Sequence, residues 1–280
     1  MRENKCLVQG YRGCYHEMAM HQIFDKSSFV AVACDSFQRL AEGLMEDEAP
    51  VAVMAIENSI AGSILQNYRI LRENKLQIIG ETYLRIKHQL MALPGQSLDE
   101  LTEVVSHPMA LNQCLDFLQA HPGMERKEYS DTALAAMDIS SNHRLGSAAI
   151  ASSLAAELYG LDILAKDIES DENNYTRFFI LQKRQSREQS LQPYDKASIY
   201  LRLKHEPGSL LVVLECVRDL HLNLSKLQSF PVLGAPGEYY FFLDLEFERS
   251  DKYYVFIKTI TPKVLACEEL GIYQRANLND

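Results

Sequence analysis

The chain has 280 residues, of which 47% are hydrophobic and 24% are charged, and its net charge is −10. This composition is typical of a globular protein and excludes a disordered chain, and the length fits one large domain or two unequal ones. The acidic balance disfavours a nucleic-acid partner, because neutralising phosphates needs a basic surface. No apolar run approaches the roughly 18 residues that cross a bilayer, and the N-terminus lacks the apolar segment of a signal peptide. We therefore expect a cytoplasmic protein that binds neither nucleic acid nor membrane.

The cysteines form no Cys-x-x-Cys pair, and no histidine stands at zinc-finger spacing. We expect free, mostly buried thiols in a reducing compartment and no bound metal. The six residues are Cys6, Cys14, Cys34, Cys114, Cys216 and Cys267.

Short apolar runs alternate with helical patterns over the first two thirds of the chain. The near-continuous apolar run Val51–Ile56 is typical of a buried parallel strand, and Ser36 is a candidate N-cap. The alternation predicts an α/β, doubly wound sheet. In chain order, strands are expected at 5–9, 28–33, 51–56, 76–89, 90–93, 104–105, 127–130 and 176–182, and helices at 15–24, 36–45, 60–73, 108–118, 133–139 and 148–159, the last closed by Gly160.

The polar segment Lys183–Asp195 has no periodicity and contains Pro193, as is typical of a linker. After it we expect strands at 198–203, 222–228, 238–247 and 269–274, helices at 209–220 and 251–266, and a loop at 230–237. This βαββαβ order in about 80 residues predicts a ferredoxin-like unit. The predicted organisation is a large domain at 1–183, a linker at 184–195 and a small domain at 196–280.

Small polar residues gather at five predicted junctions between strands and helices. In a doubly wound sheet these junctions lie at the carboxyl ends of the strands, where helix N-termini point free N–H groups into a crevice. Each junction alone is well explained as a helix cap, whereas the five together favour a cleft for a small carboxylate. They are Gly10–Gly13, Glu57–Ser59, Ser106–His107, Asp131–Thr132 and Gly146–Ser147.

The sequence carries none of the usual cofactor or nucleophile motifs. Gly10-x-x-Gly13 lacks the third glycine of a dinucleotide fingerprint, and there is no Walker lysine or Gly-x-Ser-x-Gly elbow. Ser106 and His107 are neighbours in sequence, which is poor geometry for a nucleophile and its base. We therefore expect chemistry without a cofactor.

The segment Asn173–Phe178 offers a hydroxyl, a fork-shaped cation and an aromatic wall within three residues. Strand alternation places Thr176 and Phe178 on one face and Arg177 on the other. The segment could equally be a loop followed by a strand, with Arg177 in a surface ion pair.

Taken in order, these motifs resemble the prephenate dehydratase family with a C-terminal ACT regulatory domain, over almost the whole chain. The large-domain matches are Gly10-x-x-Gly13-Cys14-Tyr15-His16-Glu17, Ile56-Glu57-Asn58-Ser59-x-x-Gly62, Ser106-His107-Pro108 with Ala110 and Gln113, Asp131-Thr132-Ala133, Ala148–Ser152 and Asn174-x-Thr176-Arg177-Phe178. The small-domain matches are Pro207-Gly208-Ser209-Leu210 and Asn223-Leu224 with Gln228-Ser229-Phe230-Pro231.

The chain departs from the family pattern at several positions. Tyr11 and Ala55 stand where proline is common, and Met109 replaces a glutamine. Gln228 and Phe230 replace the glutamate and arginine of the effector motif, which puts control by an effector in question.

The resemblance implies a two-lobed catalytic domain, similar to periplasmic binding proteins, followed by a ferredoxin-like ACT domain. It implies a lyase that converts prephenate to phenylpyruvate, carbon dioxide and water without a cofactor, in phenylalanine biosynthesis. No chorismate mutase segment precedes the domain, so we expect a monofunctional enzyme, a homodimer or homotetramer, that is feedback-regulated by L-phenylalanine. Two alternatives stay open: an arogenate dehydratase, and a two-lobed binding protein without catalysis.

The resemblance also assigns roles to individual residues. Thr176 is the expected catalytic group, donating a hydrogen bond to the leaving hydroxyl. The expected substrate-binding residues are Tyr15, Asn58, Ser59, Ser106, His107, Arg177 and Phe178. His107 could equally be a helix-start residue bonded to backbone. The expected effector-binding residues, between paired small domains, are Gly208, Ser209, Leu210, Asn223, Gln228 and Ser229.

Overall fold

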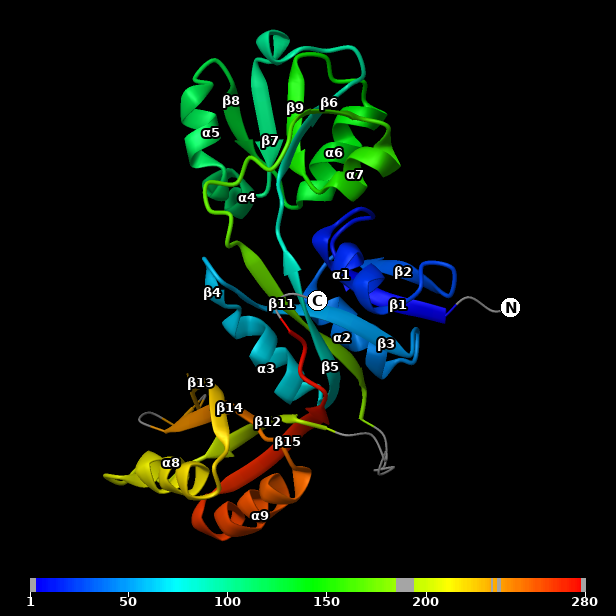
Figure 1. The fold of residues 1–280 in the computed structure, drawn as a ribbon. Helices are drawn as coiled ribbons and strands as arrows, with labels where there is room; N and C mark the ends of the chain where they lie inside the picture. Colours follow the sequence, from blue (N-terminus) through cyan, green and yellow to red (C-terminus); the bar gives the residue numbers. More distant parts are fainter. Residues whose placement is uncertain (1–3, 185–193, 233, 236–237, 278–280) are drawn as a thin grey trace. The chain divides into compact units, whose positions relative to one another are not determined.

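The structure is a computed structural model that describes residues 4–184, 194–232, 234–235 and 238–277 (Figure 1). The chain divides into two compact units, one of Met1–Ile70 with Thr82–Phe179 and one of Leu71–Glu81 with Ile180–Asn279. Most of the predicted linker lies outside the described residues, so the predicted domain limits stay predictions. In the described ranges, no helix has the length and apolar character needed to cross a membrane.

The first sheet is built mainly from the N-terminal part of the chain. Its strands are β1 (Asn4–Gln9), β2 (Phe29–Cys34), β3 (Val51–Asn58), β4 (Gly62–Ser63), β5 (Leu76–Arg85) and β11 (Tyr175–Lys183), and its helices are α1 (Tyr15–Ile23), α2 (Phe37–Met45) and α3 (Leu65–Glu73). The strand order is β2-β1-β3-β11-β5, with β4 paired to β3. β1 is parallel to both β2 and β3, and β3 is buried along nearly its whole length, as a central parallel strand must be.

The second sheet lies entirely within the first unit. Its strands are β6 (Gln89–Ala92), β7 (Glu103–Ser106), β8 (Glu125–Glu128), β9 (Ser147–Ala151) and β10 (Asp162–Ala165), with η1 (Leu98–Glu100), α4 (Pro108–Gln113), α5 (Leu115–Ala120), α6 (Thr132–Ser141) and α7 (Ser153–Tyr159). The strand order is β10-β6-β9-β7-β8, and Figure 1 shows α4 and α5 on one side of it and α6 and α7 on the other. Two sheets with helices on their faces confirm the two-lobed α/β prediction.

The helix predicted at 148–159 is wrong in its first half. Residues Ser147–Ala151 form β9, and all five are buried. Alanines fit a strand that is covered on both faces, so packing overrides their helix propensity. The helix begins only at Ser153, capped by the Ser152 hydroxyl, which accepts from Ala155 N at 3.0 Å. The predicted end at Gly160 is confirmed, with φ of 62°.

Other boundaries also differ. The helix predicted at 60–73 begins at Leu65, because Gly62, with φ of 80°, turns the chain into the short strand β4. β8 lies two residues before the predicted 127–130, and β10 was not predicted. Ser36 and Asp131 cap α2 and α6 as expected, each accepting from a backbone N–H.

The second unit contains the predicted βαββαβ order. Its elements are β12 (Lys196–Arg202), α8 (Ser209–Asp219), β13 (Asn223–Pro231), β14 (Tyr239–Glu246), α9 (Ser250–Ile260), η2 (Thr261–Lys263) and β15 (Ala266–Tyr273). The antiparallel strands have the order β13-β14-β12-β15, which confirms the ferredoxin-like unit. α9 is shorter than the predicted 251–266, because Pro262 ends it in a 3-10 turn. β13 extends two residues into the predicted loop, part of which lies outside the described residues.

The segment Leu71–Glu81 belongs to the second unit for two physical reasons. The Lys196 ammonium and the Glu81 carboxylate lie 2.9 Å apart, with side chains only 4% and 0% exposed. Gly271 passes so close to β5 that a Cβ there would lie 2.0 Å from the Ile78 carbonyl oxygen. A buried ion pair and a backbone approach that only glycine permits thus fix this segment on the antiparallel sheet.

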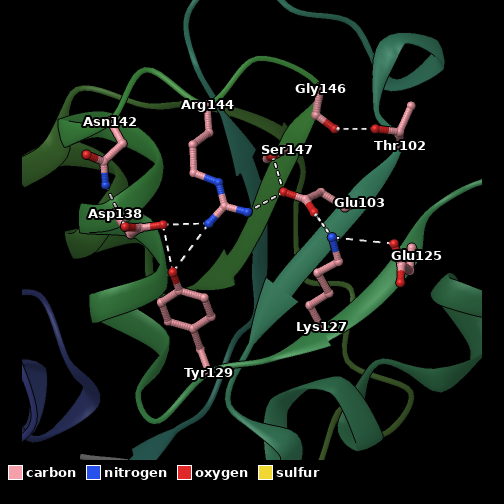
Figure 2. A network of polar contacts seen from close by, with 10 residues as sticks. All are labelled: Thr102, Glu103, Glu125, Lys127, Tyr129, Asp138, Asn142, Arg144, Gly146 and Ser147. Atoms are coloured by element: carbon pink, nitrogen blue, oxygen red, sulfur yellow. Dashed lines mark hydrogen bonds and ion pairs between the residues drawn. The ribbon is translucent and has the colours of Figure 1, made fainter.

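A network of charges closes one end of the second sheet (Figure 2). The Glu103 carboxylate accepts from Lys127 Nζ at 2.6 Å and also contacts Arg144 and Ser147. Arg144 reaches the Asp138 carboxylate as well. The bonds from Lys127, then from Ser147 and Arg144, lower the pKa of Glu103 to about 2.

This network corrects one of the five predicted cleft junctions. Ser147 begins β9 instead of a helix, so Gly146–Ser147 lies at the amino end of its strand. The Ser147 hydroxyl donates to Glu103 there, and neither Gly146 nor Ser147 lines the cavity described below.

We predict that Glu103→Gln lowers the free energy of unfolding at neutral pH by about 1–3 kcal/mol, because the partly buried Arg144 and the exposed Lys127 lose their shared anion. The folded state depresses the pKa of Glu103, so its stabilisation is present above about pH 4.5 and is lost as pH falls toward 2. Urea unfolding of both proteins at pH 7 and pH 3 should show the difference shrinking in acid.

Glu125→Gln is the matched control, because Glu125 is 70% exposed and lies 3.4 Å from the same Lys127. This substitution should lower the free energy of unfolding by less than about 0.5 kcal/mol. Equal decreases in the free energy of unfolding of the two variants would contradict this account. So would a decrease in Glu103→Gln that does not change with pH.

Candidate active site

A cavity of about 380 Å³ in the first unit is lined by elements of both its sheets. This volume suits a small organic ligand. The lining residues used below are Tyr15 and His16 on α1, Asn58 at the end of β3, His88 before β6, His107 and Gln113 at the two ends of α4, Asp131 and Thr132 at the start of α6, and Thr176 and Phe178 on β11. Four of the five predicted junctions contribute to this cavity or adjoin it.

β11 presents its side chains as the alternation predicts. Thr176 and Phe178 line the cavity. Arg177 is not among the lining residues; it is 4% exposed, and its guanidinium carbon lies 4.7 Å from the centre of the Phe179 ring. The hydroxyl and the aromatic wall of the predicted trio therefore meet at the cavity, and the cation does not.

The Asn58 carboxamide holds the Thr176 hydroxyl. Its Nδ2 donates to Thr176 Oγ1 at 3.0 Å and to Asn174 Oδ1 at 2.7 Å. Its Oδ1 accepts from the backbone N–H groups of Ile60 and Ala61 at 3.0 and 2.9 Å. Because the Thr176 oxygen accepts from Asn58, its own proton is available to a ligand in the cavity.

Further hydrogen bonds connect Asn174 to α1 along the cavity wall. Asn174 Nδ2 donates to Gln113 Oε1 at 3.0 Å. His88 Nε2 lies 2.9 Å from the same Gln113 oxygen, and His88 Nδ1 lies 2.8 Å from the Tyr15 hydroxyl. A continuous chain of side chains thus runs from Tyr15 to Thr176 and joins elements of both sheets.

His88 is the member of this chain that the sequence did not single out. It lies near the end of an extended run predicted at 76–89, with no neighbouring polar motif. Gln113 and Asn174 were quoted as parts of motifs, but without a role. Only the packing of α4 against the segment before β6 brings these side chains together.

The predicted residue Ser59 ties two segments without lining the cavity. Its hydroxyl donates to Asn173 O at 2.7 Å and accepts from Tyr175 N at 2.9 Å. These bonds hold the chain directly before Thr176 against the end of β3.

Ser106 and His107 have separate roles. Ser106 is fully buried and donates to Ile150 O at 2.6 Å, across to β9, and does not line the cavity. His107 lines the cavity and caps α4, where its Nδ1 accepts from Met109 N at 3.1 Å. The interpretation of His107 as a helix-start residue bonded to backbone is therefore confirmed.

The cavity wall contains one carboxyl group, that of Asp131, and otherwise neutral side chains. Burial lowers the pKa of His16 to about 3, and its Nε2 accepts from Ala55 N at 3.2 Å. Burial raises the pKa of Cys14 to about 12 and also raises that of Asp131, which caps α6 through Leu134 N. Within the described ranges, no lysine or arginine lines the cavity, so an anion there depends on neutral donors and on the N-terminus of α6. The same ranges contain no group of three or more His, Cys, Asp or Glu placed to hold a metal.

A second cavity, of about 410 Å³, lies in the second unit around the turn that precedes α8. It is lined by residues 203–211 with Glu238, Tyr239 and Phe241, and so includes the predicted Gly208, Ser209 and Leu210. The other predicted effector residues do not line it. Asn223 donates to Glu246 at 2.9 Å, and Gln228 Nε2 donates to Ser229 O at 3.1 Å.

Solved structures cover nearly the whole chain. The structure of a prephenate dehydratase from Arthrobacter aurescens in complex with L-Phe is 26% identical, with a TM-score of 0.87 over 98% of this chain and 91% of that one. GqqA, described as a novel type of quorum quenching acylase, is 27% identical, with a TM-score of 0.89 over 99% of this chain and 100% of that one.

Sequence comparison gives the family. Arogenate dehydratase/prephenate dehydratase 1, chloroplastic, of Arabidopsis thaliana is 36% identical over 257 residues, which cover 87% of this chain and 64% of the relative. This chain thus spans less than two thirds of the length of that relative. The prephenate dehydratase family model matches residues 6–186, well over half of the chain. The chain belongs to the prephenate dehydratase family.

Proposed function

We propose that the protein is a prephenate dehydratase, a carbon–oxygen lyase that converts prephenate to phenylpyruvate, carbon dioxide and water in phenylalanine biosynthesis. Family membership supports the reaction class. The observation that carries the proposal is the Thr176 hydroxyl, which accepts from Asn58 and so keeps its proton for a ligand beside Phe178. No cofactor is needed, because aromatisation of the ring drives the reaction.

The reaction needs no covalent bond between the protein and the substrate. The bond to the ring carboxylate breaks, its electron pair enters the ring as carbon dioxide leaves, and the bond to the ring hydroxyl breaks. One proton converts the departing hydroxide to water. Thr176 donates a hydrogen bond to that oxygen, and the proton that completes the water comes from the solvent; such general-acid assistance typically contributes 10²–10⁴-fold.

The cavity wall suits both ends of this substrate. Phe178 and the neutral His16 ring, whose centres lie 5.1 Å apart, give an apolar face against the substrate ring, which favours neutral carbon dioxide over a carboxylate. The pyruvyl carboxylate would meet neutral donors and the start of α6 at Thr132.

We keep the predicted substrate contacts that line this cavity, which are Tyr15, Asn58, His107 and Phe178. Ser59, Ser106 and Arg177 lie outside the lining, and we assign them supporting roles. In that role they hold the strands that carry the contact residues.

The likeness to a quorum quenching acylase calls for a comparison with acyl transfer, which needs an activated nucleophile. The Cys14 thiol has a raised pKa and donates to Gln9 O, so it supplies little thiolate. The Ser106 hydroxyl is buried and directed to Ile150 O. Both groups donate to backbone carbonyls instead of to a base, which favours dehydration.

Arogenate, the aminated counterpart of prephenate, is the second candidate substrate. The name of the Arabidopsis relative includes both activities, and the geometry at Thr176 serves either ring. A binding protein without catalysis remains the alternative from another class.

We further propose that L-phenylalanine is a feedback effector that binds the cavity before α8 between paired subunits. The Arthrobacter relative was solved in complex with L-Phe, and the predicted effector residues Gly208, Ser209 and Leu210 line this cavity. The free N–H groups at the start of α8 would donate hydrogen bonds to the amino-acid carboxylate, and Tyr239 and Phe241 offer an aromatic wall. A homodimer or homotetramer and a cytoplasmic location belong to the same proposal.

We predict that Thr176→Ala lowers kcat by about 10²–10⁴-fold, with the melting temperature nearly unchanged, because Thr176 makes one side-chain hydrogen bond. Thr176→Ser, which keeps the hydroxyl, should retain most of the activity. The measurement follows phenylpyruvate and phenylalanine by mass after adding prephenate or arogenate.

Wild-type turnover of arogenate alone would change the substrate assignment, and binding of prephenate without turnover would favour the binding protein. Full activity in folded Thr176→Ala would remove Thr176 from the mechanism. Hydrolysis of an acyl homoserine lactone without dehydration would favour the acylase.

We predict that Gly208→Val abolishes L-phenylalanine binding by calorimetry and leaves prephenate turnover intact. Gly208 has φ of 83°, and a β-branched residue would distort the turn into α8. Gln228→Ala is the control and should bind as the wild type does, because Gln228 does not line this cavity. The reverse pattern would place the effector on β13 instead.

A further inference from the structure

We propose that His88 is a positioning residue, whose Nε2–H fixes the Gln113 carboxamide so that the Gln113 amide nitrogen serves the cavity as a second substrate donor beside Thr176. The inference rests on the proposed dehydratase function. It assigns His88 a role that acts through Gln113 and not through contact with the reacting atoms.

Two backbone groups fix the orientation of the Asn58 carboxamide. Ile60 N and Ala61 N can only donate, so the Asn58 atom that they contact is Oδ1. The other end of the Asn58 carboxamide is therefore the NH₂ group. It donates both to Thr176 Oγ1 and to Asn174 Oδ1.

The Asn58 orientation also fixes which atoms donate and accept in Asn174 and Gln113. Because Asn174 accepts through Oδ1, its other end is Nδ2, which donates to Gln113. The Gln113 atom at this contact must therefore be Oε1. His88 Nε2 lies 2.9 Å from that oxygen, so it must carry a proton.

The remaining nitrogen of His88 closes the chain. Burial lowers the pKa of His88, and the ring is neutral at pH 7. With the proton on Nε2, Nδ1 has a lone pair and lies 2.8 Å from the Tyr15 hydroxyl, whose single proton is shared between this nitrogen and the Lys87 carbonyl oxygen at 3.1 Å. Glu169, the nearby carboxylate, accepts from the His88 backbone N–H at 2.9 Å and leaves both ring nitrogens to these partners.

This polarity decides what Gln113 offers to a ligand. Its Oε1 is occupied by two donors, from His88 and Asn174. Within the described part of the chain, Gln113 Nε2 makes no hydrogen bond and is not fully buried. Because Gln113 lines the cavity, this nitrogen is open to it. Gln113 thus presents an amide donor, and a reversed carboxamide would present a carbonyl oxygen.

The orientation of the Gln113 carboxamide matters because the proposed substrate has two carboxylates. No cationic side chain of the described residues lines the cavity. An amide N–H attracts a carboxylate, whereas a carbonyl oxygen repels it. A net hydrogen bond of about 1–1.5 kcal/mol corresponds to roughly a tenfold change in affinity. Loss of His88 leaves Asn174 as the single anchor of Gln113, so we expect an effect of this size on substrate binding.

The experiment compares His88→Leu, His88→Gln, Gln113→Ala and the double variant His88→Leu with Gln113→Ala, in the full chain. His88→Leu should raise KM for prephenate about tenfold and leave kcat within about threefold. His88→Gln, whose terminal amide reaches about as far as Nε2 and can donate, should stay within about threefold of the wild type in KM. In the Gln113→Ala background, His88→Leu should add less than about twofold, because its target is already gone.

Gln89→Leu is the matched control. Gln89 follows His88, is 4% exposed, donates to Asp167 at 2.9 Å and does not line the cavity. It should lower stability without raising KM. Additive effects in the double variant, a His88→Gln variant as impaired as His88→Leu, or the same rise in KM in Gln89→Leu would overturn the proposal.

A second readout does not depend on activity. Nitrogen NMR of the wild-type protein should show the His88 ring protonated at Nε2 and bare at Nδ1 at neutral pH. The opposite tautomer would overturn the positioning role even in an active enzyme. Failure of the wild type to turn over either substrate would instead reject the dehydratase function and leave this tautomer test valid.

Discussion

The orientation of the Asn58 carboxamide is the constraint on which the candidate site depends. Two backbone N–H groups, from Ile60 and Ala61, hold its oxygen and leave its nitrogen to face Thr176 and Asn174. These N–H groups lie in the turn that Gly62 makes between β3 and β4. A local backbone feature thus sets the direction of every later hydrogen bond, from Thr176 to Tyr15.

The two sheets of the first unit make this local feature useful. β3 and β11 bring Asn58 and Thr176 together from positions 118 residues apart in the chain. α4 and the segment before β6 add Gln113 and His88 from the second sheet. This part of the cavity wall is thereby a set of neutral donors with fixed directions, which can meet an anionic ligand without reorganising.

Much of the site could be predicted where the information is local. Alternation along β11 is enough to put Thr176 and Phe178 on one face, and the caps Ser36 and Asp131 are visible as single residues before helical patterns. The resemblance to a known family added the order of the motifs. These features depend on a few consecutive residues, so the sequence alone contains them.

The rest depends on packing between distant segments. The alanines of β9 have high helix propensity and form a strand only because both faces of that strand are covered, and the same error misplaced Ser147. His88 has no local signal, because its partners Gln113 and Tyr15 are 25 and 73 residues away. Ser106 and Arg177 are predicted substrate contacts, but neither lines the cavity, because their orientation follows from sheet pairing that the sequence does not show.

The most direct test of the central claim is the kinetics of Asn58→Asp, a substitution that keeps the shape of the side chain. One carboxylate oxygen can still accept from Ile60 and Ala61, but the other faces Thr176 and accepts a hydrogen bond from its hydroxyl, which then no longer points to the ligand. The account predicts a folded protein, by circular dichroism, in which kcat falls by about 10²–10⁴-fold, as for loss of a general acid. Turnover close to that of the wild type would contradict it, because the Thr176 proton would then not need the Asn58 donor.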